Sequence, residues 1–272
     1  MSQPVTTNAR HPRGLYVLFF TEMWERFGYY LMVGILFLYL RDPVSGGGFG
    51  MDTSVAAGIV GTYVALIYLT PFIGGLLADR YLGYRKSIYI GGSLMALGYF
   101  LIAIHGSTAL LYLSLTCVII GNGFFKPNIS TLLGNMYNKE ELKSKKDTAY
   151  NIFYMGINIG AFICNFVAAY LRHHYAQGWG LAFSAAGFGM VLSMIFFASG
   201  LKHVKHADVI KPVKPEDMPI SKIVYSVFLP AIVAGAIGWF IPGNIMGSDS
   251  NDAFIFACLP IIYFYFTLWS KA

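Results

Sequence analysis

The sequence predicts an all-α polytopic membrane protein, and three observations support this class. Of the 272 residues, 56% are hydrophobic and only 12% are charged, which is about half the charged fraction of a soluble domain. The charges cluster, and the intervals between them are long enough for bilayer-spanning helices of about 20 apolar residues. Because these intervals are continuously apolar and do not alternate with polar residues, helices are favoured over barrel strands.

Eight apolar runs have the length of a spanning helix. The first six are joined by mostly short loops, and a basic stretch that contains prolines separates them from the last two. Their approximate ranges are 15–40, 54–78, 87–105, 108–136, 148–171, 180–200, 222–245 and 253–270.

The order of these runs predicts the organisation of the chain. Six helices, a basic linker and further helices are typical of transporters built from helical bundles. A second, C-terminal bundle is therefore expected, and it is absent from this chain. The predicted parts are a cytoplasmic N-terminus (1–14), a six-helix transmembrane bundle (15–200), a cytoplasmic linker (201–221) and two inserted transmembrane helices (222–272).

The basic residues indicate topology. Two of the 19 Lys and Arg lie inside apolar runs; if the N-terminus is cytoplasmic, fifteen others fall on that side and only Arg41 and Arg172 on the other. This asymmetry is the positive-inside rule. We therefore expect a multi-pass protein of the inner (plasma) membrane with a cytoplasmic N-terminus. Its partner is the lipid bilayer, and the net charge of +6 does not indicate nucleic acid.

Ionisable side chains interrupt the first apolar run. Glu22, Glu25, Arg26 and Tyr29 recur at helical spacing and share one face. Each charge costs about 2.5–3.5 kcal/mol at the bilayer centre, so the charges must pair or face a polar cavity. Since apolar packing would stabilise the helix better than a buried ion pair, their presence favours a function.

The two acids and one base of this stripe require another cation. Lys126 is the only other Lys or Arg within a run, and we expect it to face the cluster across the bundle. Protonation of a glutamate would release Lys126, and an anionic group of a substrate would take its place. This charge count gives the hypothesis that protons and substrate are coupled.

Further polar residues extend the candidate site. Tyr29, Tyr30, Tyr63 and Tyr68 carry phenol groups that can donate to a ligand, whereas most other tyrosines are expected to pack or to anchor at the interface. Asn158, on an apolar run, binds either a ligand or another helix. Gly156 and Gly160 are spaced for close helix contact. The short turn after the second run suits conformational gating, through Asp79, Arg80 and Arg85.

No catalytic or metal-binding pattern accompanies these residues. The three cysteines lie in apolar runs without ligand spacing and are expected to be core residues. Nucleophile–base pairs and histidine clusters are missing from the runs. We therefore expect no enzyme, no metal and no cofactor, with protons as the coupling ion.

Four segments resemble the signatures of known transporters. The turn at 75–86 resembles the loop signature of the major facilitator superfamily. Segments 121–128 and 153–160 resemble the fourth-helix and fifth-helix signatures of the proton-dependent oligopeptide transporter (POT) family. The first apolar run resembles the first-helix signature of that family at six positions, Glu22, Glu25, Arg26, Phe27, Tyr29 and Tyr30.

The resemblance implies the N-terminal six-helix bundle of a major facilitator fold plus two additional transmembrane helices. It implies that Glu22, Glu25 and Lys126 couple protons, and that Arg26 and Lys126 bind the carboxylate of a peptide. It also implies peptide contacts from Tyr29, Tyr30, Tyr68 and Asn158. One position departs from the family, because Val33 stands where many members carry a second basic residue.

The expected function is a proton-coupled symporter that imports di- and tripeptides by alternating access and is a monomer when complete. A second hypothesis keeps the fold and the proton coupling but changes the cargo to another small anionic solute. A hypothesis from a different class is a non-transporting membrane receptor or regulatory fragment, which would require the chain to end naturally at Ala272.

Overall fold

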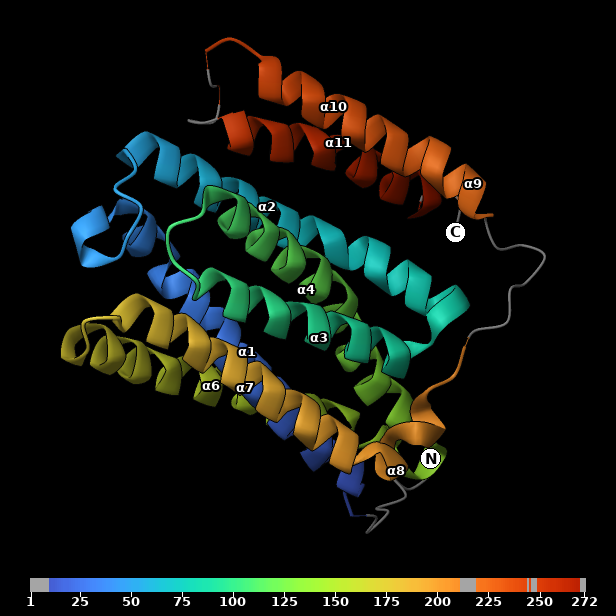
Figure 1. Ribbon diagram of the computed structural model, residues 1–272. Coiled ribbons are helices and arrows are strands. Elements are labelled where there is room, and N and C mark those ends of the chain that lie inside the picture. Colours follow the sequence, from blue (N-terminus) through green and yellow to red (C-terminus); the bar gives the residue numbers. More distant parts are fainter. Residues whose placement is uncertain (1–9, 211–218, 244, 246–248, 270–272) are drawn as a thin grey trace. The chain divides into compact units, whose positions relative to one another are not determined.

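The computed structural model describes residues 10–210, 219–243, 245 and 249–269, and its regular elements over those ranges are helices (Figure 1). The chain forms two compact units, one from Met1–Met51 and Leu69–Lys211 and the other from Asp52–Tyr68 and Pro212–Ala272. Parts of the predicted N-terminus, linker and final helix, including Lys211, Lys214 and Lys271, lie outside the described residues.

The structure contains the six predicted helices, each within a few residues of its expected bounds, and all but most of the second helix lie in the first unit. One short helix follows α4 and another follows α7. A π-helical turn at Ala78–Leu82 ends α2. The elements are α1 (Arg13–Arg41), α2 (Thr53–Leu77, of which residues 53–68 belong to the second unit), α3 (Tyr84–Ile102), α4 (Thr108–Met136), α5 (Glu140–Lys143), α6 (Lys146–His174), α7 (Gly178–Ser199) and α8 (Leu201–Val204).

Within the described residues, five helices are long and apolar enough to cross a membrane: Thr53–Leu82, Thr108–Met136, Lys146–His174, Gly178–Ser199 and Ser221–Phe240. Helix α1 is long enough at 29 residues, but its internal charges lower its hydropathy. Basic residues in the first turn of α3 have the same effect.

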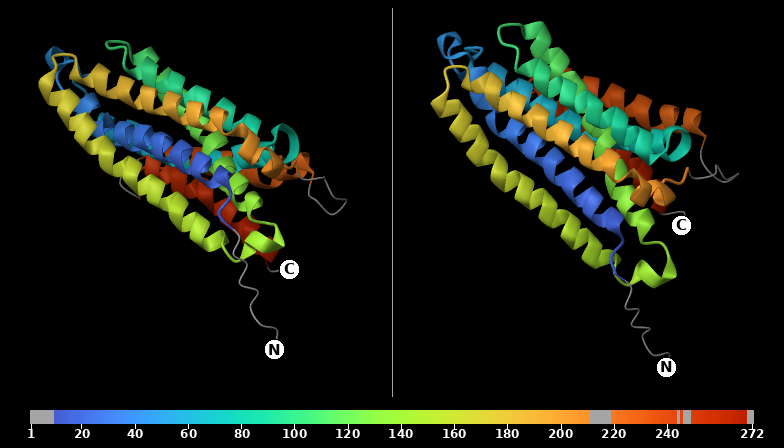
Figure 2. Two further views of the ribbon diagram at one scale, coloured as in Figure 1. Left: turned by 90° about the horizontal axis from the view of Figure 1, so that it is seen from below. Right: turned by 60° about the horizontal axis from the view of Figure 1, so that its bottom comes forward.

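Small residues set the helix contacts of the first unit. Helix α1 packs against α6 and α7, and α3 packs against α4 and α7; Figure 2 shows α1 between α6 and α7. A Cβ atom added at Gly160 would collide with the Met23 carbonyl and lie 3.0 Å from the Phe27 nitrogen, and one at Gly156 would lie 3.1 Å from the Phe19 carbonyl. The predicted close contact through Gly156 and Gly160 is therefore confirmed, with α1 as the partner.

Residues 201–210 pack on the bundle, although the sequence predicted a linker from residue 201. Val204 and Ala207 are buried, and the Asn135 side-chain amide donates to the Ala207 carbonyl at 3.2 Å. The described part of the first unit therefore extends to residue 210, about ten residues beyond the predicted end of the bundle.

One carboxylate, that of Asp42, joins the C-terminal end of α1 to its neighbours in the first unit. Asp42 accepts hydrogen bonds from Arg172 at 2.8 Å and from the Trp179 indole at 2.7 Å. The Arg172 guanidinium also lies over the Trp179 ring, 4.4 Å from its centroid. This contact ties the end of α1 to α6 and α7.

The second unit contains a helical hairpin. Helix α9 (Ile220–Ile223), a π-helical turn (Val224–Phe228) and α10 (Leu229–Phe240) lead to α11 (Asp249–Trp269). Gly235 lies against Ala257, and Gly238 lies against the Asp252 backbone. The α11 residue in contact moves from Ala257 back to Asp252 as the α10 glycine moves forward from Gly235 to Gly238, so the two helices are antiparallel.

Gly160→Val is expected to destabilise the protein by about 1–3 kcal/mol, because the new side chain overpacks the contact between α1 and α6. Thermal unfolding of the detergent-solubilised protein measures the effect as a lower melting temperature. Gly34→Val is the matched control, since a Cβ at Gly34 meets no atom within 4 Å. Equal melting temperatures for the two variants would contradict the close contact.

Candidate functional site

Helix α1 buries all three of its central charges. Glu22, Glu25 and Arg26 are 3%, 0% and 2% exposed. The helix is anchored beside them, because the Ser193 hydroxyl of α7 donates to the Thr21 carbonyl at 2.6 Å. Since α1 runs without a break from Arg13 to Arg41, the side chains of one face are held in register along the helix axis.

Arg26 connects the charged stripe. Its guanidinium binds both oxygens of Glu25, through Nη2 to Oε1 at 2.6 Å and through Nε to Oε2. Glu22 Oε1 lies 3.3 Å from Arg26 Nε. The guanidinium also lies over the Tyr29 ring, 4.7 Å from its centroid. The four residues expected to share a face therefore form one network.

The two carboxylates of this network differ in how they are bound. Both oxygens of Glu25 are occupied by Arg26. Glu22 Oε2 is buried and has no hydrogen-bond partner among the described residues. A buried acceptor without a donor is uncommon in folded proteins. Glu22 is therefore the carboxylate of the pair with an unused acceptor position.

Lys126 of α4 lies within electrostatic range of Glu22, Glu25 and Arg26, and its residue is half-buried. That Lys126 pairs with the two glutamates stays a prediction. Asn122 lies one helical turn earlier on α4 and is fully buried. Asn122 is not among the predicted site residues, although it is a polar amide on an apolar run, four residues before Lys126.

The α4 segment around Lys126 is held closely against α2. Pro127 lacks the N–H that would bond to the Gly123 carbonyl, and Gly123 and Gly74 meet at backbone distance. The Thr70 hydroxyl donates to the Ile119 carbonyl at 3.0 Å. The Asn128 amide donates to the Phe124 carbonyl at 2.7 Å. These contacts fix the α4 backbone on both sides of the lysine.

The other predicted ligand contacts are more exposed than the charged network. Tyr30 packs its ring 5.2 Å from that of Tyr29 and is 38% exposed, and Asn158 is exposed on α6. Tyr68 is 60% exposed and belongs to the second unit, so its approach to the cluster remains a prediction.

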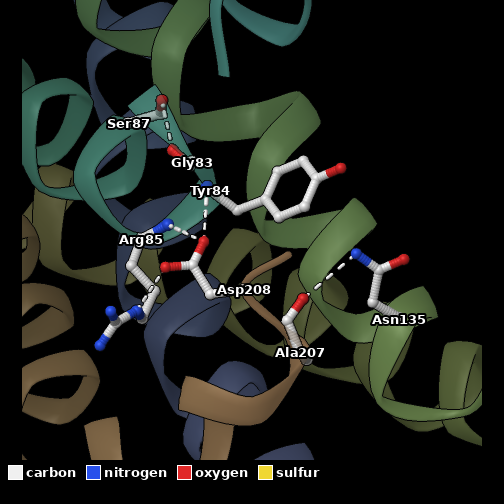
Figure 3. A network of polar contacts seen from close by, with 7 residues as sticks. All are labelled: Gly83, Tyr84, Arg85, Ser87, Asn135, Ala207 and Asp208. Carbon is white, nitrogen blue, oxygen red and sulfur yellow. Dashed lines mark hydrogen bonds and ion pairs between the residues drawn. The ribbon is translucent and has the colours of Figure 1, made fainter. Parts of the chain in front are cut away.

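The three predicted gating residues have different surroundings. Arg85 forms an ion pair with Asp208 (Figure 3). Asp79 accepts a hydrogen bond from the Tyr84 hydroxyl. Arg80 makes no ion pair among the residues that the structure describes. Over the same residues, no three His, Cys, Asp or Glu gather in a group able to hold a metal ion.

Spanning helices around buried charges define a polytopic membrane protein with an internal polar site. The POT family model matches residues 85–237, more than half of the chain, and the chain belongs to this family.

Solved structures support the same fold. One, a peptide transporter POT in complex with sulfate, is 35% identical with a TM-score of 0.70, over 94% of this chain and 52% of that chain. Another, a POT family transporter in complex with a thioalcohol-conjugated peptide, is 32% identical with a TM-score of 0.72, over 84% of this chain and 46% of that chain. The predicted fold class is therefore confirmed: the N-terminal six-helix bundle of a major facilitator fold with two additional helices.

Curated relatives include both characterised and uncharacterised transporters. The di-/tripeptide transporter of Lactococcus lactis subsp. lactis (strain IL1403) is 35% identical over 270 residues, which cover 96% of this chain and 53% of that protein. The uncharacterized transporter YclF of Bacillus subtilis (strain 168) is 42% identical over 188 residues, which cover 69% of this chain and 37% of that protein. The chain thus spans about half or less of the length of these relatives.

Arg26→Leu is expected to cost about 3–5 kcal/mol of stability, because it leaves two carboxylates buried without their shared cation. Thermal unfolding in detergent tests this. Arg13→Leu is the control on the same helix, since Arg13 is exposed in the first turn. If both variants unfold at the wild-type temperature, Arg26 does not hold the network together.

Proposed function

We propose that the intact protein is a proton-coupled symporter that imports di- and tripeptides by alternating access, with this chain as its N-terminal part. The buried cluster of Glu22, Glu25 and Arg26, with the half-buried Lys126 in electrostatic range, is the observation that carries the proposal. Two acids and two bases are neutral together when all are ionised. A proton on one acid leaves a net positive site inside apolar helices, which favours entry of an anionic group.

Glu22 is the residue that carries the proton in this proposal. Its second oxygen is buried without a donor among the described residues, so an added proton or a donor group is accommodated there. Glu25 instead acts as the fixed counter-ion of Arg26, because the bidentate pair uses both of its oxygens. A neutral Glu22 weakens the hold of the network on Lys126.

The peptide carboxylate then binds Lys126, supported by Arg26. Lys126 is the less buried of the two cations. Arg26 already binds Glu25 and is covered on one face by the Tyr29 ring. Tyr29, Tyr30, Tyr68 and Asn158 are proposed to contact the peptide, and an acidic group of the expected second bundle would bind its amino group.

The remaining assignments follow from the same proposal. The protein is a monomeric carrier of the inner (plasma) membrane with a cytoplasmic N-terminus, and it has neither enzymatic activity nor a cofactor. Asp79, Arg80 and Arg85 belong to a gate on the cytoplasmic side. The asymmetric distribution of Lys and Arg supports this orientation, and the names of the relatives support peptide cargo.

A second candidate keeps the fold and the proton coupling but transports another small anionic solute. Val33 favours it, because that position lacks the second basic residue found in many members of the family. A non-transporting receptor would keep ligand binding and lose accumulation. Uptake measurements separate all three functions.

Uptake into liposomes tests the proposed function. The intact protein with an inward proton gradient is expected to accumulate labelled dipeptide, with loss of accumulation on adding a proton ionophore and competition by unlabelled di- and tripeptides. Lys126→Ala is expected to abolish this uptake because the carboxylate loses its binding cation. Lys139→Ala, at an exposed position after α4, is the control. Wild-type uptake by Lys126→Ala would refute the network, and competition by other anions alone would favour the second candidate.

Glu22→Gln is expected to uncouple transport from the proton gradient while peptide exchange across the membrane continues, because a permanently neutral side chain imitates the protonated state. A counterflow assay measures the rate of peptide exchange, and an uptake assay with a proton gradient measures the rate of coupled transport. Glu25→Gln is predicted to lower stability as well, since it weakens the bidentate pair with Arg26. Gradient-driven accumulation at the wild-type level by Glu22→Gln would assign the proton to another group.

A further inference from the structure

Helix α3 begins without a cap of its own. Gly83 precedes the helix with a φ of +76° and has no side chain to accept hydrogen bonds from the first turn. The first N–H groups of any helix need external acceptors. Here Asp208 supplies them from far along the sequence: its Oδ1 accepts the Tyr84 N–H at 2.8 Å and the Arg85 N–H at 3.2 Å (Figure 3).

The same carboxylate binds the Arg85 side chain. Arg85 Nε donates to Asp208 Oδ2 at 2.5 Å, and the two side chains are 30% and 11% exposed. Both oxygens of Asp208 are therefore engaged by the first turn of α3. A negative charge at a helix N-terminus is also favoured by the helix dipole.

Asp208 is held in place by the segment that carries it. The Asn135 amide of α4 donates to the neighbouring Ala207 carbonyl at 3.2 Å, and Ala207 is buried. A Cβ at Gly83 would lie 3.2 Å from Asp208 Oδ1. The close approach and the positive φ both favour glycine at this position.

Tyr84 extends the contact to the other side of the turn. Its backbone N–H binds Asp208, while its hydroxyl donates to Asp79 Oδ1 at 2.8 Å. The Tyr84 side chain is fully buried. One residue thus connects Asp79, at the end of α2, with Asp208, beyond the end of α7.

We propose that Asp208 is a positioning residue for the turn between α2 and α3. It fixes Arg85 directly and Asp79 through Tyr84, so that the turn moves with the bundle as one body during alternating access. This inference rests on the gating role assigned above to the turn. Arg85 is then an internal anchor of the turn.

Hydrogen exchange in the intact protein tests the positioning. Asp208→Ala is expected to speed exchange of the Tyr84 and Arg85 amides by about tenfold, because it removes their shared acceptor and its charge. Asp208→Asn keeps one acceptor oxygen and is expected to exchange more slowly than Asp208→Ala. Asp147→Ala is the control, since Asp147 is exposed in the first turn of α6. Unchanged exchange in Asp208→Ala overturns the proposal.

Uptake kinetics test the consequence for gating. Asp208→Ala is expected to lower the maximal rate at least fivefold with KM within twofold of wild type, and Asp208→Asn is expected to recover most of that rate. A raised KM at an unchanged maximal rate would place the effect at the substrate site and overturn the gating role. If the wild type does not transport peptide, the proposed function fails, and the exchange experiment still decides whether Asp208 positions the turn.

Discussion

The bidentate pair between Arg26 and Glu25 is the interaction on which the site depends. An unpaired charge inside an apolar helix bundle is costly in free energy. The bidentate hydrogen bonds lower this cost for both Arg26 and Glu25, because each charge is paired with the other. Glu22 then shares Arg26 at 3.3 Å and keeps one oxygen unused. Lys126, within electrostatic range of all three, is the cation proposed to balance the remaining negative charge. A proton or an anionic ligand therefore changes the charge of the whole network, not that of a single side chain.

Close packing of helices keeps this network buried. Glycines bring α6 against α1 beside the charges, and α2 against α4 beside Lys126. Backbone contact leaves little room for independent movement of one helix against another. The described helices of the first unit are therefore suited to move together, and Asp208 extends this rigid body to the turn that follows α2. Transport by alternating access requires such rigid bodies.

Much of this arrangement followed from the sequence. Continuous apolar runs fixed the helices to within a few residues, and helical spacing placed Glu22, Glu25, Arg26 and Tyr29 on one face. The charge count predicted that Lys126 faces them, and the structure puts it within electrostatic range. Spacing could not distinguish the two glutamates, since that difference depends on which oxygens Arg26 reaches. It also missed Asp208, because the partner of Arg85 lies 123 residues away in a segment whose composition predicted a solvated linker.

Calorimetry of peptide binding to the intact protein tests the central claim most directly, which is that a proton and a peptide carboxylate act on one charge network. The binding heat is measured at one pH in two buffers with different ionisation enthalpies, for wild type and Glu22→Gln. The account predicts uptake of about one proton per peptide bound by the wild type, and none by the variant. Binding heat of the wild type that is independent of the buffer, at pH values where transport is coupled, would contradict it.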